Sequence, residues 1–329
     1  MRVTVIPMTR RPLCNIYVAS CEADGGVYEY ALFDNGDSEQ VRKIPCPSPM
    51  YLAKEDGKLY ALLRAPFENS SDSGVAVFDE KSGEALSKLL STEGEVGCHI
   101  ATHNGDVYCA NYTGGSVCKV GAAKVTHKGE GPDKKRQTSP HPHSVLLSPD
   151  GKHLFTADLG TDTVYVYTNK LDFVTSATVP QGSGARHLCF SPTGEYLYCV
   201  GEMRGNITVF SWNGGTLTPI YTLDLLKSGG ASGSAAAIKL SSDGCFLYVT
   251  ERRECEIITL LAEGEKLTEI SRISSFGKEP RDIIEAAGGS LLICANQWSD
   301  CVSVFALKDG VPTHLSSFSL PSPIALIEK

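Results

Sequence analysis

Residues 139–167 carry the sequence SPHPHSVLLSPDGKHLFTADLGTDTVYVY, in which three short apolar runs are separated by turn residues. The runs are SVLL, HLFTA and VYVY, and the segments between them are SPDG and DLGTD. β-Branched and aromatic side chains suit a pleated sheet, and Pro, Asp and Gly suit the turns that bound each strand. The stretch therefore predicts three consecutive antiparallel strands.

The same pattern recurs along the chain at a nearly constant spacing. The glycines that close the equivalent turns stand at positions 57, 105, 151, 194, 244 and 289. After each turn comes an apolar strand, as in LYALL, YLYCV or FLYVT, then a third strand and a more polar fourth one. A period in the mid-forties with four strands per unit is typical of β-propeller blades, whereas a sandwich or jelly roll requires no such period.

The two ends of the chain complete the count of blades. Residues 15–19 (NIYVA) and 27–30 (VYEY) match the second and third strands of a blade, but no first strand precedes them. Residues 323–327 (PIALI) supply the missing first strand, so that pairing of the terminal strands closes the ring and leaves no open sheet edge there. The prediction is an all-β, seven-bladed propeller that forms a single domain over residues 1–329. Residues 1–13 are left unassigned, and GGASGS at 229–234 is expected to be a flexible crossing between blades.

Composition limits the classes of partner. Hydrophobic residues make up 42% of the chain, which is enough for a globular core, and the formal net charge is -8. Nucleic-acid binding requires a basic face, so no nucleic-acid partner is expected, although a local arginine cluster could still hold a small anion. The N-terminal apolar run is too short for a secretory signal and no stretch could span a bilayer. A cytoplasmic protein without a membrane partner, monomeric or weakly dimeric, is expected.

The 12 cysteines include no CxxC pair, which removes the usual pattern of a zinc knuckle or a dithiol redox motif. Several of them, such as Cys109, Cys199 and Cys294, stand inside apolar strands. Reduced thiols that act as small hydrophobic side chains are therefore expected.

Polar and charged residues collect at two kinds of strand end. Within a blade the first strand begins, and the second strand ends, at the same face of the ring, so these residues should surround the central opening. First-strand starts carry His141, His143, Arg186, His187 and Arg281, and second-strand ends carry Asp158, Glu202, Arg252, Arg253 and Gln297. The sequence therefore predicts one site that several blades share.

Four segments resemble successive blades of the lactonase family of seven-bladed propellers. They begin HPHSVLLSPDG, GARHLCFSPTG, SAAAIKLSSDG and EPRDIIEAAGG, and the likeness is strongest from about residue 139 to residue 305. The family includes propeller-type 6-phosphogluconolactonases and the fungal carboxymuconate cyclase, so the resemblance implies either the opening or the formation of a lactone.

The resemblance also implies catalytic positions, namely His143 in PHS, Arg186 in GARH, Glu202 after LYCVG and Arg252 after LYVTE. His141, His187, Arg281 and Gln297 are expected to bind substrate. The chain departs from the family pattern at Ala185, where proline is common, and at Glu251, where asparagine is usual. The second departure is expected to add a negative charge near an anion site, which puts the substrate in doubt.

Each of these side chains also has an alternative role. The arginines could tie blades together through carboxylates, but three planar guanidinium groups at one face favour binding of a carboxylate or phosphate. Glu202 could simply pair with Arg186 or Arg204, and arginines would lower its pKa, which suits a base. His141 and His143 could form a metal pair, with Glu202 or Asp158 as third ligand, yet nothing in the spacing fixes that ligand, so neither metal nor cofactor is expected. Asp158 and Asp162 are expected to cap turns.

Three functions remain open on the sequence alone. The favoured one is metal-independent hydrolysis of a small anionic sugar lactone, most plausibly 6-phosphogluconolactone, with Glu202 or His143 as the base. The second is cyclisation of 3-carboxy-cis,cis-muconate at the same arginines, and the third is a non-catalytic propeller that binds a protein or small ligand. Neither a GxSxG elbow nor a Trp-Asp repeat dipeptide is present, which disfavours a serine hydrolase and a protein-binding WD repeat.

Overall fold

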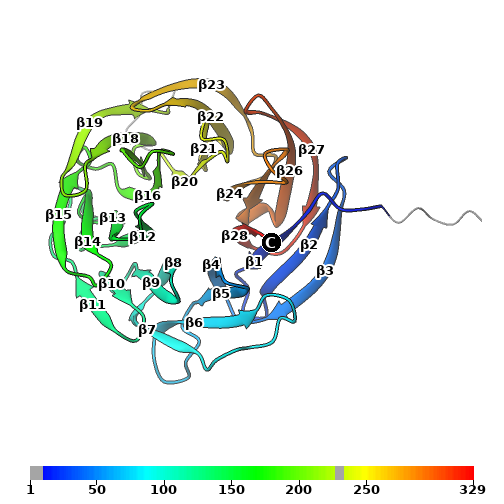
Figure 1. The fold of residues 1–329 in the computed structure, drawn as a ribbon, viewed down its shortest axis with the longest axis horizontal. Helices are drawn as coiled ribbons and strands as arrows, with labels where there is room; N and C mark the ends of the chain where they lie inside the picture. The colour runs from blue at the N-terminus through cyan, green and yellow to red at the C-terminus, as the bar shows by residue number, and fades with distance from the viewer. Residues whose placement is uncertain (1–9, 227–232) are drawn as a thin grey trace, which may run out of the picture.

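A computed structural model describes residues 10–226 and 233–329 of the chain. Over these residues the strands form seven sheets of four antiparallel strands, arranged as a ring (Figure 1). One short 3₁₀ turn, η1 (Gln297–Ser299), interrupts the otherwise all-β structure of the described residues. The predicted seven-bladed propeller is thus confirmed.

Blade 1 joins the two ends of the chain and consists of β28 (Pro323–Glu328), β1 (Cys14–Ser20), β2 (Gly26–Leu32) and β3 (Ser38–Pro45). Blades 2 and 3 consist of β4 (Pro49–Glu55), β5 (Lys58–Leu63), β6 (Asp72–Asp79), β7 (Leu90–Glu95), β8 (Gly97–His103), β9 (Asp106–Asn111), β10 (Ser116–Lys119) and β11 (Ala123–Thr126). Blades 4 and 5 consist of β12 (Pro142–Leu147), β13 (His153–Asp158), β14 (Thr163–Thr168), β15 (Phe173–Thr178), β16 (Ala185–Phe190), β17 (Tyr196–Gly201), β18 (Asn206–Trp212) and β19 (Leu217–Asp224). Blades 6 and 7 consist of β20 (Ala235–Leu240), β21 (Phe246–Glu251), β22 (Glu256–Glu263), β23 (Lys266–Ser274), β24 (Pro280–Ala286), β25 (Leu291–Asn296), β26 (Cys301–Lys308) and β27 (Val311–Ser319).

Closure of the ring follows the prediction. β28 pairs with β1 in antiparallel fashion, with Leu326 opposite Val18, so the chain ends lie in one sheet. Of the unassigned segment, residues 1–9 lie outside the described part of the chain, and Arg10 forms an ion pair with Asp37. Of GGASGS, residues 229–232 also lie outside it, so the expected flexible crossing is not described.

The tight turn between the first and second strands depends on glycine. Gly151 closes the turn of blade 4 at φ 69° and Gly244 that of blade 6 at φ 75°, in the left-handed region that other residues rarely adopt. The Asp150 carboxylate accepts hydrogen bonds from the Ser148 hydroxyl and the Lys152 amide. The SPDG segment therefore forms a tight turn, as predicted.

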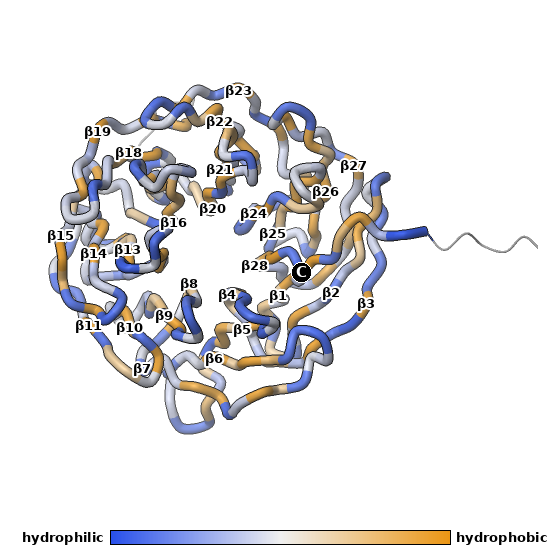
Figure 2. The backbone as a smooth tube through the Cα atoms, viewed as in Figure 1, coloured by the Kyte–Doolittle hydropathy of each residue, from blue (hydrophilic) through white to orange (hydrophobic). Residues whose placement is uncertain are grey.

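The core lies between blades. Apolar residues follow the strands while hydrophilic residues gather at the turns (Figure 2). Between blades 5 and 6, Val200 and Leu247 are completely buried in one cluster, and each contributes about 1.5–3 kcal/mol of burial energy. The Tyr198 hydroxyl donates to the Gly264 carbonyl across the same boundary. Packing of this kind fixes the position of each blade relative to the next.

The 12 cysteines all lie in the described residues and are free, with Cys109, Cys199 and Cys294 buried as expected. Over the same residues, the structure contains no helix with the length and apolar character needed to cross a bilayer.

Candidate active site

A β-bulge begins every innermost strand of the described structure. In blade 4 the pairing passes from Pro142 directly to Ser144, so His143 has no partner residue on the next strand. A bulge turns one side chain out of the regular alternation, and here the innermost strands surround the axis of the ring (Figure 1). In the order of the blades, the bulged residues are Ile324, Met50, Cys98, His143, Arg186, Ala236 with Ala237, and Arg281.

A second set of residues follows the ends of the second strands, where the chain turns at the same face. In the order of the blades these residues are Cys21, Arg64, Tyr112, Leu159, Glu202, Arg252 and Gln297. Most of the predicted site residues therefore fall into two equivalent positions of the repeat. Asp158 does not, because it is the last residue of β13, one position before the turn.

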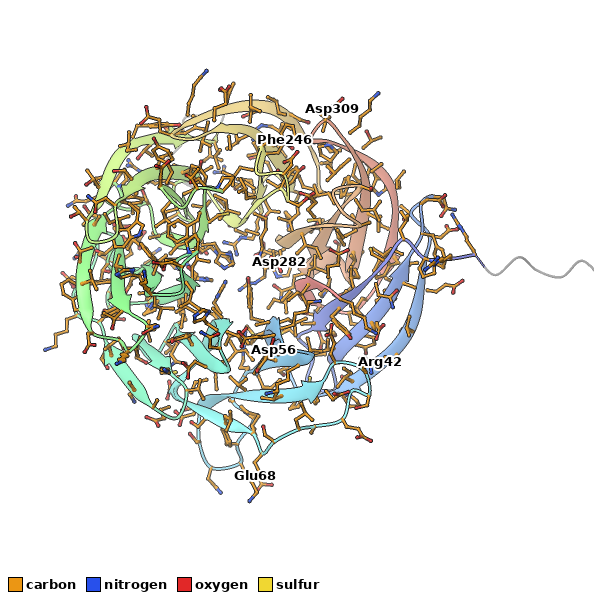
Figure 3. All side chains as sticks on the ribbon, in the orientation of Figure 1. Arg42, Asp56, Glu68, Phe246, Asp282 and Asp309 are labelled. Atoms are coloured by element: carbon orange, nitrogen blue, oxygen red, sulfur yellow. The ribbon has the colours of Figure 1, made fainter. Side chains whose placement is uncertain are left out.

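The bulged residues enclose a cavity of about 20 Å³ at the centre of the ring, enough for about one water molecule. Asp282, which follows the bulge of blade 7, lies near the middle of the ring in Figure 3. The cavity is lined by Met50, Tyr51, Cys98, His143, Arg186, His187, Arg281, Asp282 and Ile324. Predicted residues from blades 4, 5 and 7 thus meet in one place.

Glu202 is the centre of the charged network. Its side chain is 7% exposed, and its carboxylate accepts hydrogen bonds from Arg186 Nε at 2.9 Å and Arg136 Nη2 at 2.7 Å. Arg252 Nη2 lies 3.2 Å from the same carboxylate. One buried carboxylate therefore holds three guanidinium groups, one from a connection, one from its own blade and one from the next blade.

A second buried carboxylate, Glu279, extends the network toward blade 7. Arg252 Nη1 donates to Glu279 Oε1 at 2.8 Å, and Arg281 Nη1 lies 3.7 Å from that oxygen. Four guanidinium groups thus share two carboxylates, which leaves a local excess of positive charge in an acidic protein. Such an excess suits an anionic ligand.

The network shifts the acidity of its members. Burial alone would raise the pKa of Glu202, but Arg252 and Arg186 outweigh it and hold the pKa far below the usual range. Burial, together with Arg252, lowers the pKa of Arg186 to about 10, so the guanidinium stays charged at neutral pH. The predicted lowering of the Glu202 pKa is present, and it makes this carboxylate a weak base whose oxygens are already occupied by arginines.

His143, unlike Glu202 and Arg186, is uncharged in this network. Burial and the charge of Arg186 hold the pKa of its imidazole well below 6.5, so the ring is neutral at physiological pH. Its Nε2 lies 3.8 Å from Glu202 Oε2. Among the described residues that line the central cavity, His143 Nδ1, Arg186 Nη1 and Asp282 Oδ1 are buried without a hydrogen-bond partner. Since unpartnered buried polar atoms are costly, these three atoms mark where a bound water or ligand would be satisfied.

The other predicted binding residues lie at different distances from this network. His187 lines the central cavity, with its ring centroid 5.5 Å from that of His143. His141 stacks on Tyr112 at 4.4 Å, and its Nδ1 lies 3.0 Å from the Tyr112 carbonyl oxygen. Gln297 reaches Ser322, with Nε2 3.4 Å from the hydroxyl, so the structure does not bring it to the arginines.

The two acidic turn residues take the predicted capping role. Asp158 Oδ1 accepts hydrogen bonds from the amides of His141 and Gly160. Asp162 accepts from the amides of Gly182 and Gly184. Both carboxylates therefore stabilise the backbone.

Glu251 places a buried negative charge directly before Arg252 in the chain, and its carboxylate has backbone partners. Glu251 is the last residue of β21, the position that Asp158 has in blade 4, and it is completely buried. Its two carboxylate oxygens accept the backbone amides of Ser234 and Glu254. The carboxylate therefore caps a turn, and its effect on the choice of substrate stays a prediction.

Three residues of the network were not among the sequence predictions. Arg136 lies on the long connection between β11 and β12, and half of its side chain is exposed. Tyr112 follows β9 and places its hydroxyl 3.4 Å from Arg136 Nη2. Glu279 immediately precedes β24. Tyr112 directly follows the second strand of its blade, as Glu202 and Arg252 do, so the repeat could have indicated it. Arg136 has no equivalent position in the repeat.

Two larger pockets flank the network. The Arg136 pocket, of about 460 Å³, is lined by Pro132, Asp133, Arg136, Gln181, Gly182, Glu202, Met203, Arg204, Gly233 and Ser234. The Trp298 pocket, of about 470 Å³, is lined by Gly233, Ser234, Arg252, Arg253, Cys255, Lys278, Glu279 and Trp298. Both share Gly233 and Ser234, so they adjoin, and each has room for a ligand the size of a sugar phosphate.

The hypothesis of a histidine metal pair gains no third ligand. Across residues 10–226 and 233–329, no three His, Cys, Asp or Glu side chains cluster in a way that could hold a metal ion.

Comparison with known proteins gives consistent matches. A family model described as "Lactonase, 7-bladed beta-propeller" matches residues 15–327. An uncharacterized protein, YwcC, of Lactococcus lactis is 36% identical over 80% of this chain and 81% of its own length. A periplasmic gluconolactonase of Pseudomonas aeruginosa is 28% identical, with a TM-score of 0.85 over 96% of this chain and 98% of that one. A candidate 6-phosphogluconolactonase of Bacteroides fragilis is 26% identical with the same TM-score and the same coverage of both chains.

Proposed function

Because the chain belongs to the lactonase family of seven-bladed β-propellers, we propose that it hydrolyses a small anionic sugar lactone, with 6-phosphogluconolactone as the first candidate. The observation that carries this proposal is the juxtaposition of a neutral buried histidine with an excess of guanidinium charge. The solved relatives named for gluconolactone and 6-phosphogluconolactone support the same substrate class.

Hydrolysis needs a base for water and a donor for the oxyanion. With its proton on Nε2, toward Glu202, His143 presents the unpartnered Nδ1 lone pair to a water in the central cavity. That water attacks the lactone carbonyl carbon while Nδ1 accepts its proton. Arg186 Nη1, which has no partner among the described residues, donates to the oxyanion as negative charge develops.

Collapse of the tetrahedral intermediate completes the reaction. The bond between the carbonyl carbon and the ring oxygen breaks, and the protonated His143 returns its proton to that oxygen. The products are a carboxylate and a hydroxyl on one open chain, plus one proton released to solvent. Glu202 acts by holding Arg186 and Arg252 in position, rather than as the base, because its own oxygens are engaged and its pKa is low.

The test is a panel of substrates with purified protein, in which acid release is measured above spontaneous hydrolysis. We expect turnover of 6-phosphogluconolactone with a higher kcat/KM than unphosphorylated gluconolactone. Cyclisation of 3-carboxy-cis,cis-muconate in place of lactone opening would assign the same arginines to the reverse type of reaction. Turnover of none of the three substrates would reject the proposal in favour of a non-catalytic propeller.

Replacing His143 with alanine should lower kcat by roughly 10²- to 10⁴-fold, the usual contribution of a positioned general base. The fold should persist, because the lost ring contacts lie at the cavity and not in the core between blades. Circular dichroism and the melting temperature serve as the control. A fully active His143→Ala protein would remove this residue from the mechanism.

The pH profile gives an independent test of His143. A histidine whose folded pKa lies below 6.5 stays unprotonated at pH 6.5, so kcat/KM should remain flat from about pH 8 to below about pH 6.5 and fall only at lower pH. Stability changes in the same direction: the unfolded state takes up a proton first, so acidification below about pH 6.5 costs folding free energy. An activity midpoint at or above pH 6.5 would show that another group is the base.

A further inference from the structure

The indole of Trp298 is unusually exposed for its size, with 73% of the residue accessible to solvent. Among the described residues that line the Trp298 pocket, it is the only large aromatic side chain, and it lies with Arg252 and Glu279 of the charged network. A large exposed aromatic residue next to a polar site often marks a binding surface.

The backbone that carries this indole is firmly held. Trp298 lies in η1, and its amide donates to the Lys278 carbonyl at 3.1 Å. The amide of Gln297 donates to the Glu279 carbonyl at 3.0 Å, and the Lys278 amide donates to the Ser299 hydroxyl at 2.8 Å. Three hydrogen bonds therefore fix η1 to the segment that contains Glu279, and hence to Arg252. The backbone at Trp298 therefore needs no rearrangement when a ligand stacks on the ring.

The chemistry of the pocket combines this flat apolar surface with cationic groups. Lys278 is exposed, and within the described residues its ammonium makes no ion pair. Arg252 is fully engaged by Ser234, Glu202 and Glu279, and among the described residues that line the pocket Lys278 offers an ammonium group to a new anion. A pyranose phosphate can place the C–H face of its ring on an aromatic side chain and its phosphate beside an ammonium group.

We propose that the Trp298 pocket binds the pyranose ring of an anionic sugar lactone, with the indole stacked on the C–H face of the ring and Lys278 facing the phosphate. This assignment rests on the proposed lactonase function and adds where the body of the substrate lies. The pocket contacts the network through Arg252 and Glu279, and Glu279 lies 3.7 Å from Arg281, which lines the central cavity. Trp298 is then a residue for substrate specificity, not a catalytic one.

Tryptophan fluorescence tests the proposal directly. The chain has two tryptophans, so replacing one of them leaves Trp298 as the single source of indole emission. Trp212 lies at the end of β18, with its ring 4.9 Å from Phe155, far along the blade from the site, and Trp212→Phe leaves Trp298 as the single indole. Glucose 6-phosphate is the probe, since it keeps the ring and phosphate but cannot be hydrolysed. We expect a saturable change in Trp298 emission and weaker binding of glucose.

Kinetics provide the second measurement. Trp298→Ala should raise KM for the lactone about tenfold with kcat nearly unchanged, because the lost contact buries ring C–H groups without touching the reacting atoms. Trp298→Phe should recover most of the loss. Lys278→Ala should weaken binding of glucose 6-phosphate to the level of glucose, whereas the exposed, remote Lys170→Ala should have no effect.

The outcomes separate this proposal from the proposed function. Lactone turnover without an emission change, and with unaltered KM in Trp298→Ala, would overturn the Trp298 subsite alone. A loss of phosphate-dependent binding in Arg204→Ala but not in Lys278→Ala would overturn it in favour of the Arg136 pocket. An emission change with no lactone turnover would support the sugar-phosphate subsite while rejecting the hydrolytic function.

Discussion

Replacing Glu202 with glutamine is expected to have the largest effect of any single change, lowering kcat/KM about a hundredfold or more and destabilising the fold. The carboxylate accepts Arg136 and Arg186 and lies 3.2 Å from Arg252. Glutamine keeps the shape but removes the charge, so three guanidinium groups lose their common buried anion. Removing one partner of a buried ion pair costs about 3–5 kcal/mol. The arginines should also shift, and misplacement of an oxyanion donor typically costs about 10²- to 10³-fold in rate.

Two measurements check this expectation, namely the free energy of unfolding in denaturant and steady-state kinetics at neutral pH. Glu195→Gln is the matched control, because Glu195 is an exposed glutamate in the first turn of the same blade. It should keep wild-type stability and activity. If Glu202→Gln were as stable and as active as the control, the network would have no organising role.

Replacing Arg186 with lysine should lower kcat by about 10²- to 10³-fold while KM changes little. The planar guanidinium uses Nε for Glu202 and leaves Nη1 unpartnered, so one side chain both holds its position and offers a donor. A lysine ammonium on a flexible stem cannot do both with fixed geometry. The positive charge is kept, so this substitution separates geometry from charge.

The comparison for Arg186→Lys is Arg272→Lys in β23, where the arginine pairs with Glu256 and Glu269 away from the central cavity. That variant should keep its kcat. An Arg186→Lys enzyme whose kcat stays within about threefold of wild type would exclude Arg186 as the oxyanion donor.

Much of the fold was predictable because each repeat is defined by local sequence features, namely its turn glycine and its apolar strands. Turn glycines such as Gly151 and Gly244 adopt positive φ and recur at a nearly constant spacing, so the start of each blade can be located in the sequence. Closure through β28 and β1 was predictable for the same reason, since each end of the chain supplied a different part of one blade.

The candidate site was predictable where the repeat positions it. His143, Arg186 and Arg281 share the bulge position, and Glu202 and Arg252 share the position after the second strand. Arg136 could not be placed, because it reaches Glu202 from a connection whose course depends on tertiary packing.

The capping role of Glu251 could not be predicted from the sequence, because it depends on the exact place of the residue at the strand end. A shift of one residue at the end of a strand separates a side chain that caps the turn from one that faces the axis. The same shift separates Asp158 from Glu202, which the sequence had grouped together at second-strand ends.

The charge of the site explains how an acidic protein can hold an anionic substrate. Glu202 and Glu279 neutralise only part of the guanidinium charge. Their ion pairs offset the desolvation cost of the buried arginines at the centre of the ring. Burial and then the charge of Arg186 lower the pKa of His143, which keeps the proposed base neutral at physiological pH. Substrate binding and base catalysis would thus depend on one electrostatic arrangement.

A crystal structure of the protein with 6-phosphogluconate, the product of the proposed reaction, tests the central claim most directly. The account predicts that the product carboxylate lies within about 3 Å of Arg186 Nη1 and contacts Arg281, next to His143. A carboxylate bound elsewhere, with Arg186 Nη1 still buried and unpartnered, would contradict the proposed site.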